Sequence, residues 1–369
     1  MKRNKAYKFR IYPNREQEIL FQKTFGCCRF IYNQMLNDKI EHYKKTKEML
    51  HNTPAMYKSK YEWLKEADSL ALANVQLNLQ KGYSKFFKEK NIGFPKFKSK
   101  KRSRKSYTTN NQKDSIYIKN GYIKLPKAGM VRIRVHRSIS DEWKLKSVTV
   151  SQSGSGRYYA SVLYEYEIQV SESTDADKSV GLDFSMPELY VDSSGSRPQM
   201  PHFYRRAEKR LAKAQRRLSK MYVKGAKEQS HRYMKQKKAV AVLHEKTANQ
   251  RRDFLHKQSR ALVDAYDYIF IEDLNMQGMS KTMNFGKSVH DNGWGAFVNM
   301  ISYKAEEAGK HLIKIDKWYP SSQICHVCGV IDGPKALHVR KWECSACGAE
   351  LDRDINAAIN IRQAGLSMI

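Results

Sequence analysis

The stretch Ser179-Val-Gly-Leu-Asp183 decides the fold class of this chain, because it has the pattern of a short buried strand that ends in a carboxylate. Tyr268-Ile-Phe-Ile-Glu272 repeats the pattern, with an aliphatic and aromatic run closed by an acid. Basic helical patterns lie between the two stretches, and a strand at Leu312–Asp316 precedes a last helix from about Arg353. Strands that alternate with helices predict an α/β sheet.

Three carboxylates occupy matching places in this pattern: Asp183 and Glu272 end strands, and Asp354 opens the last helix. Sites of α/β folds gather at strand ends. Buried carboxylates lose hydration free energy unless cations compensate, so three converging ones indicate two Mg²⁺ ions and phosphodiester hydrolysis. Taken singly, each acid is better explained as a residue that hydrogen-bonds its own backbone, and the set of three favours the metal site. Asp352 is the better helix cap, and Asp273 points to the opposite strand face.

Four cysteines near the end of the sequence form two pairs, Cys325-His-Val-Cys328 and Cys344-Ser-Ala-Cys347, separated by 15 residues. This spacing matches the zinc-ribbon template. A glycine follows each pair, where a positive φ lets the turn wrap around a metal. We predict one structural Zn²⁺ here; a redox pair is the alternative. Cys27 and Cys28 are expected to be buried apolar residues of a helix.

The chain has 369 residues and a formal net charge of +31, from 68 Lys and Arg against 37 Asp and Glu. Such an excess predicts a polyanionic partner. No apolar run approaches the roughly 20 residues of a membrane helix, and the N-terminus lacks a signal-peptide core. These features exclude an integral membrane protein and lead us to expect a cytoplasmic, nucleoid-associated protein.

The N-terminal half combines short strands with helices. Ala6–Tyr12 alternates apolar with basic side chains and predicts a strand whose basic face, including Arg10, lies on a surface. Helical patterns extend from about Arg15 to Lys90, followed by a basic segment containing Lys96 and Lys98. Short strands then extend to about residue 166 and form a β-module with the first strand.

Amide side chains mark one helix of this half. Within Leu70–Phe87 an apolar stripe at helical spacing predicts a core face, and Asn74, Gln76 and Asn78 lie elsewhere on the helix. Amides can pair with base edges in the major groove. A solvated polar face is the alternative.

Between Arg205 and Arg260 the sequence contains 19 Lys and Arg against 4 Asp and Glu. A solvated helix face normally mixes charge signs, so this excess indicates contact with a phosphate backbone.

Several motifs together resemble the TnpB family, transposon-associated nucleases related to type V CRISPR effectors. The resemblance covers nearly the whole chain and rests on these motifs: Tyr7–Pro13, Phe94–Lys98, Val180–Asp183, Asn249–His256, Ile271–Leu274, Tyr319–Gly329 and Asp352–Ala358. One departure is Asp183-Phe184-Ser185, where many relatives continue the acid as Asp-Leu-Gly; the local turn is therefore expected to differ.

The resemblance implies an RNase H-like (RuvC-like) nuclease core with an inserted zinc ribbon, preceded by a β-barrel-like wedge module that a helical recognition module interrupts. The implied modules are 1–13 (wedge strand), 14–105 (helical recognition), 106–172 (wedge β-module), 173–320 (RuvC-like core), 321–350 (zinc ribbon) and 351–369 (end of the core).

The implied activity is that of an RNA-guided, magnesium-dependent DNA endonuclease. It would bind a guide RNA from the transposon end, recognise a short target-adjacent motif in double-stranded DNA, and cut both strands with Asp183, Glu272 and Asp354, as a monomer in the complex. The residues expected to contact nucleic acid, besides the amides, are Arg10, Lys96, Lys98, Arg206, Arg210, Arg216, Arg217, Asn249, Gln250, Arg251, Arg252 and Arg353.

Two other functions compete with this one. A transposase shares the RNase H-like core, but here the acids follow the order Asp, Glu, Asp with the zinc ribbon before the last. A guided or direct DNA-binding regulator would need the charge and the zinc, but not three site-forming carboxylates.

Overall fold

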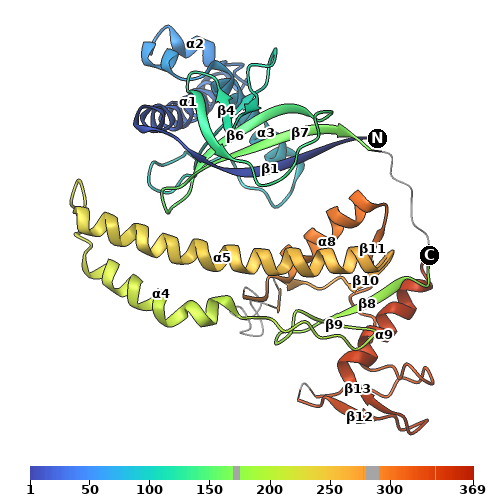
Figure 1. Cartoon of the computed structure of the whole chain (residues 1–369). Helices are drawn as coiled ribbons and strands as arrows, with labels where there is room; N and C mark the ends of the chain where they lie inside the picture. The colour runs from blue at the N-terminus through green and yellow to red at the C-terminus, as the bar shows by residue number, and fades with distance from the viewer. Residues whose placement is uncertain (169–174, 277, 280–290, 337) are drawn as a thin grey trace. The chain divides into compact units, whose positions relative to one another are not determined.

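The computed structural model describes residues 1–168, 175–276, 278–279, 291–336 and 338–369. These residues form two compact units, Met1–Ile168 and Gln169–Ile369 (Figure 1). The polar sequence of residues 170–178, which is typical of a linker, begins at this division, and its residues 170–174 lie outside the described residues.

The first unit consists of helices packed against a seven-stranded sheet with the order β2-β6-β7-β1-β5-β4-β3 (Figure 1). In β1, Phe9 and Ile11 are fully buried, whereas Lys8 is exposed, as its alternating pattern predicted. The elements are β1 (Lys2–Tyr12), α1 (Arg15–Thr46), α2 (Pro54–Lys58), the 3₁₀ helix η1 (Glu62–Glu66), α3 (Ser69–Lys88), β2 (Lys105–Asn110), β3 (Ile118–Lys119), β4 (Tyr122–Leu125), β5 (Gly129–Arg134), β6 (Lys144–Gln152) and β7 (Tyr158–Glu167).

Strand pairing corrects one expectation for this unit. The sequence led us to expect a β-barrel-like module, but in the described first unit no pairing joins the end strands β2 and β3, so the sheet is open. Helix α1 covers the buried face, where the rings of Phe21 and Phe25 pack against Tyr107. Cys27 and Cys28 are buried in α1, as predicted.

The second unit contains a four-stranded sheet with the order β11-β10-β8-β9. Strand β10 pairs in parallel with β8 and with β11, and β9 pairs antiparallel with β8. The register matches Ile271 with Leu182, so the next residues, Glu272 and Asp183, end adjacent strands at one edge. The elements are β8 (Ser179–Phe184), β9 (Tyr190–Asp192), α4 (Phe203–Lys220), α5 (His231–Ala265), β10 (Tyr268–Glu272), α8 (Trp294–Ala308), β11 (His311–Ile315), β12 (Lys341–Glu343), β13 (Glu350–Asp352) and α9 (Arg353–Leu366).

Helix α9 packs closely on this sheet because two glycines leave room for it. A Cβ atom at Gly181 would lie 2.1 Å from the carbonyl oxygen of Ala358, and one at Gly365 would lie 2.0 Å from the ring of Phe270. The glycine inside the stretch Ser179-Val-Gly-Leu-Asp183 therefore lets α9 approach β8.

Helices α4 and α5 form a long antiparallel pair that extends from the second unit (Figure 1). Leu211 of α4 is buried, and the Gln236 side-chain amide in α5 donates to Ala214 O in α4 at 3.0 Å. Among the described residues, no helix is long and apolar enough to cross a membrane.

Candidate functional site

The three predicted acids line one cavity of about 590 Å³ in the second unit. Asp183 comes from the end of β8, Glu272 from the end of β10, and Asp354 from the first turn of α9. The parallel register of β8 and β10 and the close packing of α9 bring the three together. Elements far apart in the sequence thus supply the acids.

Burial raises the pKa of two of these acids, and repulsion by neighbouring acids adds to this effect at Asp183. Burial raises the pKa of Asp183 well above its ordinary value, and the charges of Glu272 and Asp354 raise it further, whereas Arg353 and Arg340 lower it. Burial also raises the pKa of Glu272, although Ser321 Oγ, which donates to Glu272 Oε1 at 2.5 Å, partly offsets this. The acids therefore favour a bound cation.

Two arginines contact the third acid. Arg340 Nη1 lies 2.6 Å from Asp354 Oδ2, and Arg353 Nε lies 3.7 Å from Asp354 Oδ1. Asp352 caps α9 by accepting from the backbone N–H groups of Asp354 and Ile355, each at 3.1 Å, which confirms its predicted role. The cap leaves the Asp354 side chain to the cavity.

Asp273 lies outside the cavity, in agreement with the strand alternation. Its carboxylate pairs with Lys314 Nζ at 2.7 Å, and its side chain is 59% exposed. The neighbouring Glu272 faces the cavity.

The turn after Asp183, where the sequence departs from many relatives, is held by a buried amide. Asn292 Nδ2 donates to Ser185 O at 2.9 Å and to Glu188 O at 3.0 Å, and Asn292 is 1% exposed. The turn thus has a defined shape without the Asp-Leu-Gly sequence.

Sequence reasoning missed two asparagines of α9. Asn356 Nδ2 donates to Ile324 O at 2.8 Å, and Asn360 Nδ2 donates to Ser321 O at 2.8 Å. Asn356 Oδ1 also accepts from His326 N at 3.0 Å, and His326 is half-buried. Two buried asparagines one turn apart inside a helix, where asparagine is unfavourable, were the signal that could have revealed them.

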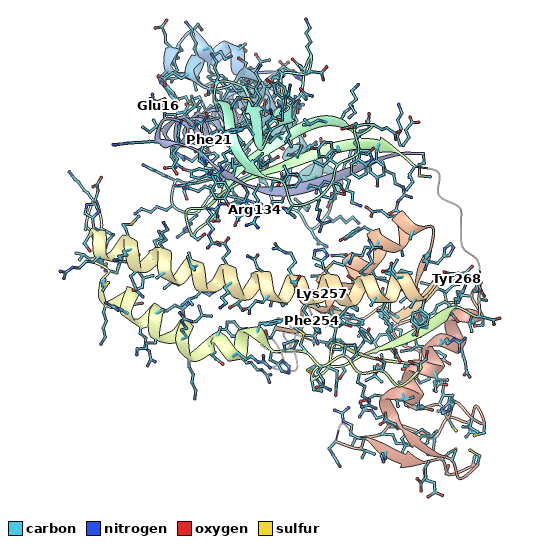
Figure 2. All side chains as sticks on the ribbon, in the orientation of Figure 1. Glu16, Phe21, Arg134, Phe254, Lys257 and Tyr268 are labelled. Carbon is cyan, nitrogen blue, oxygen red and sulfur yellow. The ribbon has the colours of Figure 1, made fainter. Side chains whose placement is uncertain are left out.

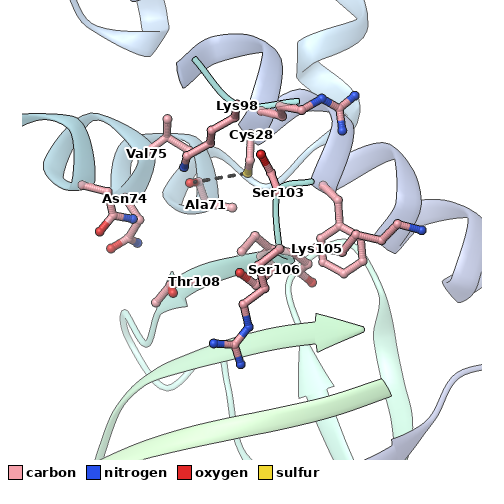
Figure 3. Close-up of a pocket in the computed structure, with 14 residues that line it drawn as sticks. Cys28, Ala71, Asn74, Val75, Lys98, Ser103, Lys105, Ser106 and Thr108 are labelled. Atoms are coloured by element: carbon pink, nitrogen blue, oxygen red, sulfur yellow. Dashed lines mark hydrogen bonds between the residues drawn. The ribbon is translucent and has the colours of Figure 1, made fainter. Parts of the chain in front are cut away.

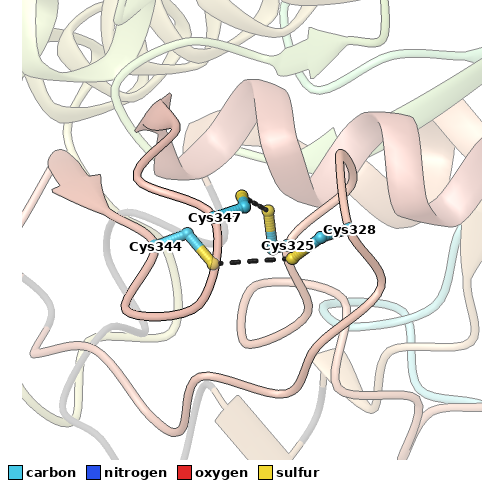
Figure 4. Close-up of side chains that lie close together, drawn as sticks. All are labelled: Cys325, Cys328, Cys344 and Cys347. Atoms are coloured by element: carbon cyan, nitrogen blue, oxygen red, sulfur yellow. Dashed lines mark hydrogen bonds between the residues drawn. The ribbon is translucent and has the colours of Figure 1, made fainter.

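The four C-terminal cysteines converge as predicted (Figure 4). Their Sγ atoms lie within 4.8 Å of one another; Cys325 and Cys347 Sγ are 3.7 Å apart, and Cys328 and Cys344 Sγ are 3.6 Å apart. A tetrahedral Zn²⁺ with Zn–S bonds of about 2.3 Å requires sulfur atoms about 3.8 Å apart. The donor set therefore fits zinc.

Local backbone geometry supports the cysteine cluster. Gly329 and Gly348 have φ values of 76° and 72°, the positive values expected from the sequence. Burial raises the pKa of Cys325, but hydrogen bonds from the backbone N–H groups of Cys328 and Val327, together with the thiols of Cys328 and Cys344, outweigh it and lower this pKa to about 7. Among the described residues, this is the only group of three or more His, Cys, Asp and Glu side chains close enough to share one ion. The three carboxylates line a common cavity but are not close enough to share one ion in this way.

A second cavity, of about 330 Å³, lies in the first unit between α1, α3 and β2 (Figure 3). Asn74, Asn78 and Lys98 line it, whereas Gln76 is not among its lining residues. Asn74 Nδ2 donates to Leu70 O at 2.9 Å, which leaves its Oδ1 to the cavity. The structure thus unites two of the predicted amides with one predicted cation.

The predicted phosphate contacts lie mainly on exposed surfaces. Side chains project along the whole length of α4 and α5 (Figure 2). In the first unit, Arg10 is half-buried, with its guanidinium 5.3 Å from the ring centroid of Tyr12 and 5.4 Å from that of Tyr159. The exposed members are Lys96, Arg206, Arg210, Arg216, Arg217, Asn249, Gln250 and Arg252, and Lys98, Arg251 and Arg353 are half-buried.

A sheet whose strand ends carry two acids beside a third acid on a helix forms a candidate metal-binding site, and comparisons with known proteins find matches in both units. Family models match residues 294–361 ("Cas12f1-like, TNB domain"), 1–48 ("Helix-turn-helix domain") and 161–283 ("Probable transposase"). A solved Cas12f1–sgRNA–target DNA complex has a chain with a similar fold: the TM-score is 0.64 at 14% identity, covering 98% of this chain and 99% of the other.

Curated relatives are similar along the whole sequence. A putative RNA-guided DNA endonuclease of Streptomyces pristinaespiralis is 35% identical over 98% of this chain and 90% of its own length. Another, from Escherichia coli (strain K12), is 30% identical over 100% of this chain and 94% of its own. The chain therefore belongs to the TnpB family of RNA-guided DNA endonucleases.

Proposed function

We propose that this protein is a magnesium-dependent DNA endonuclease that a guide RNA from the transposon end directs to its target, and that one RuvC-like site cuts both strands. The observation that carries the proposal is the single cavity lined by Asp183, Glu272 and Asp354. The two relatives that match nearly the whole chain are named putative RNA-guided DNA endonucleases, which supports the same activity for this protein.

The residues of the cavity fit Mg²⁺, which prefers carboxylate oxygens. Asp183, Glu272 and Asp354 would hold two ions, which when bound activate water and stabilise charge on the leaving oxygen of a phosphodiester. Ser321 orients the Glu272 carboxylate through its hydrogen bond. Arg340 and Arg353 bring positive charge to the cavity and can bind the phosphate oxygens of the strand to be cut.

The cysteine cluster would hold one structural Zn²⁺. Hydrogen bonds from Asn356 and Asn360 attach the start of this ribbon to α9. The ribbon would then support the helix that carries Asp354, and it would take no part in the reaction itself.

For the first unit we propose recognition of the target-adjacent motif at the cavity between α1, α3 and β2. Amides at Asn74 and Asn78 can pair with base edges in a major groove, and Lys98 can contact a phosphate beside them. Gln76, which we also predicted to contact bases, has no place in this cavity and would act outside it. We also propose that the chain has the six modules expected from the sequence. The protein would act as a monomer in its complex with RNA and DNA, at the nucleoid.

Cleavage by alanine variants tests the proposed function. With the guide RNA that co-purifies with the protein and a plasmid carrying its target, Asp183→Ala, Glu272→Ala and Asp354→Ala should each abolish cutting and leave guided DNA binding intact. Metal-liganding groups act as one unit, so each single loss should be nearly as severe as the triple loss. Asp273→Ala is the matched control, because it removes an adjacent acid that lies outside the cavity. Wild-type cutting by any of the three variants would remove that residue from the site.

Motif selection tests the role of the first unit. On a library with randomised target-adjacent sequence, Asn74→Ala or Asn78→Ala should relax the preference at particular base pairs, at a loss of roughly 1 to 3 kcal/mol there. Gln80→Ala, an exposed amide of the same helix, should leave the preference unchanged. Loss of activity without any change of motif would reject this assignment.

A further inference from the structure

An exposed tryptophan stands at the proposed cleavage site. Trp318 is 80% exposed, the most exposed of the five tryptophans, and it lines the same cavity as Asp183, Glu272 and Asp354. A single exposed apolar side chain is ordinary on a protein surface. Three features of Trp318 nevertheless require an explanation. It lies beside three acids, hydrogen bonds hold its loop in place, and its ring has cations as neighbours.

The loop that carries Trp318 is held at both ends. Before it, Asp316 Oδ1 accepts from Trp318 N at 2.6 Å, and Asp316 O accepts from Tyr319 N at 3.1 Å. After it, Ser321 Oγ donates to Glu272, and Ser321 O accepts from Asn360. The indole is therefore presented on a loop that is fixed relative to the acids.

Cations accompany the exposed ring. Lys317 Nζ lies 5.0 Å from the ring centroid of Trp318, and Arg340 and Arg353 line the same cavity. An aromatic face beside cations is the combination by which proteins bind single-stranded nucleic acid, because bases stack on the ring while the cations contact phosphates. A base inside a duplex has both faces covered by its neighbours, so only an unpaired base can use the ring.

We propose that Trp318 stacks on an unpaired base of the DNA strand next to the scissile phosphate and so holds that phosphate over the three carboxylates. Trp318 is then a positioning residue that favours strands already separated by the guide. The inference rests on the proposed function, and it identifies an unpaired base beside the scissile phosphate as the part of the substrate that Trp318 binds.

A scan with abasic DNA tests this proposal. Guide-loaded protein is mixed with targets that carry a single abasic site at successive positions around the cut, and the single-turnover cleavage rate is measured. For the wild type we expect one or two positions where loss of the base slows cleavage roughly 5- to 100-fold, the range of a base–aromatic stack. Trp318→Leu should slow cleavage of intact DNA by a similar factor. In this variant an abasic site at those positions should not slow cleavage further.

Two variants separate stacking from a structural role. Trp318→Phe keeps an aromatic face and should restore both the rate and the sensitivity to the abasic site, whereas a purely structural tryptophan would not confer position-specific sensitivity. Trp63→Leu removes another exposed tryptophan, at 44% exposure in the first unit, and should behave as wild type. The proposal is overturned if Trp318→Leu retains the wild-type pattern of sensitivity or the wild-type rate. Absence of cutting by the wild type itself would instead overturn the proposed function on which the inference depends.

Discussion

At the scale of single residues, the site carries electrostatic strain when no cation is bound. Asp183 is half-buried and lies near two other acids, and its pKa is raised well above the ordinary value. Of the three acids, Asp354 is the one with which Arg340 and Arg353 form ion pairs, so the two arginines lower the pKa of Asp183 from a greater distance. A neutral residue at position 183 should therefore suit the metal-free fold better than aspartate does.

We predict that Asp183→Asn raises the thermal midpoint of the protein in chelator, and that the gain grows as the pH rises. The unfolded chain loses the Asp183 proton near pH 4 and the folded chain loses it at higher pH, so the wild type loses stability as the pH rises through the raised pKa. Thermal unfolding across this pH range measures the effect.

Asp273→Asn supplies a control of opposite sign. A hydrogen bond from Lys314 lowers the pKa of Asp273, so its contribution to stability is present above the ordinary carboxyl pKa and is lost as the pH falls. Asp273→Asn should lower the midpoint near neutral pH. Equal midpoints for wild type and Asp183→Asn at every pH would contradict the account of the site.

Local pattern predicted the residues of the site, but not their tertiary partners. The acids at 183 and 272 follow from buried runs that end in carboxylates, and the cysteine cluster follows from spacing alone. The contact of Arg340 with Asp354 depends on where the hairpin of β12 and β13 folds, which no local pattern specifies. Gln76 does not line the cavity with Asn74 and Asn78, because a helix turns by about 100° per residue, so positions 74 and 78 share a face and position 76 does not.

At the scale of elements, the approach of α9 to β8 determines whether the acids meet. Gly181 permits that approach, because a side chain there would collide with the backbone of α9 at Ala358 and Arg362. The distance between Asp354 on α9 and Asp183 on β8 therefore depends on Gly181, a residue without a functional side chain.

We predict that Gly181→Ala costs about 1 to 3 kcal/mol of stability and reduces cleavage by displacing Asp354 from Asp183. Denaturant unfolding and the guided cleavage rate measure the two effects. Gly295→Ala in α8 is the control: no atom lies within 4 Å of a Cβ there, and alanine should be neutral or stabilising in an exposed helix. Full activity of Gly181→Ala would show that α9 can move without disturbing the site.

At the scale of the whole molecule, the net charge of +31 favours binding of a polyanion. The α4 and α5 surface bears exposed arginines, including Arg210 and Arg217, and few acids. Release of counter-ions along this surface would supply affinity that does not depend on base sequence. The path of a nucleic acid across this surface cannot be predicted from the net charge, because net charge carries no directional information.

We predict that Arg210→Gln weakens binding of all target sequences alike and lowers the slope of log affinity against log salt by about one. Binding measured at several salt concentrations checks this. Arg260→Gln changes the net charge equally, but Arg260 pairs with Asp264 at 3.3 Å, so it should leave the slope unchanged. A change of motif preference in Arg210→Gln would contradict its assignment to the backbone.

One site, built from Asp183, Glu272 and Asp354, is proposed to cut both strands of a guided target. The most direct test is a time course of plasmid cleavage with magnesium that resolves supercoiled, nicked and linear DNA for the wild type and for Asp183→Ala. Because one site must cut the strands in turn, the wild type should form nicked DNA before linear DNA, and Asp183→Ala should form neither. A variant that still nicks one strand at the wild-type rate would contradict the account, because a second site would then have to exist.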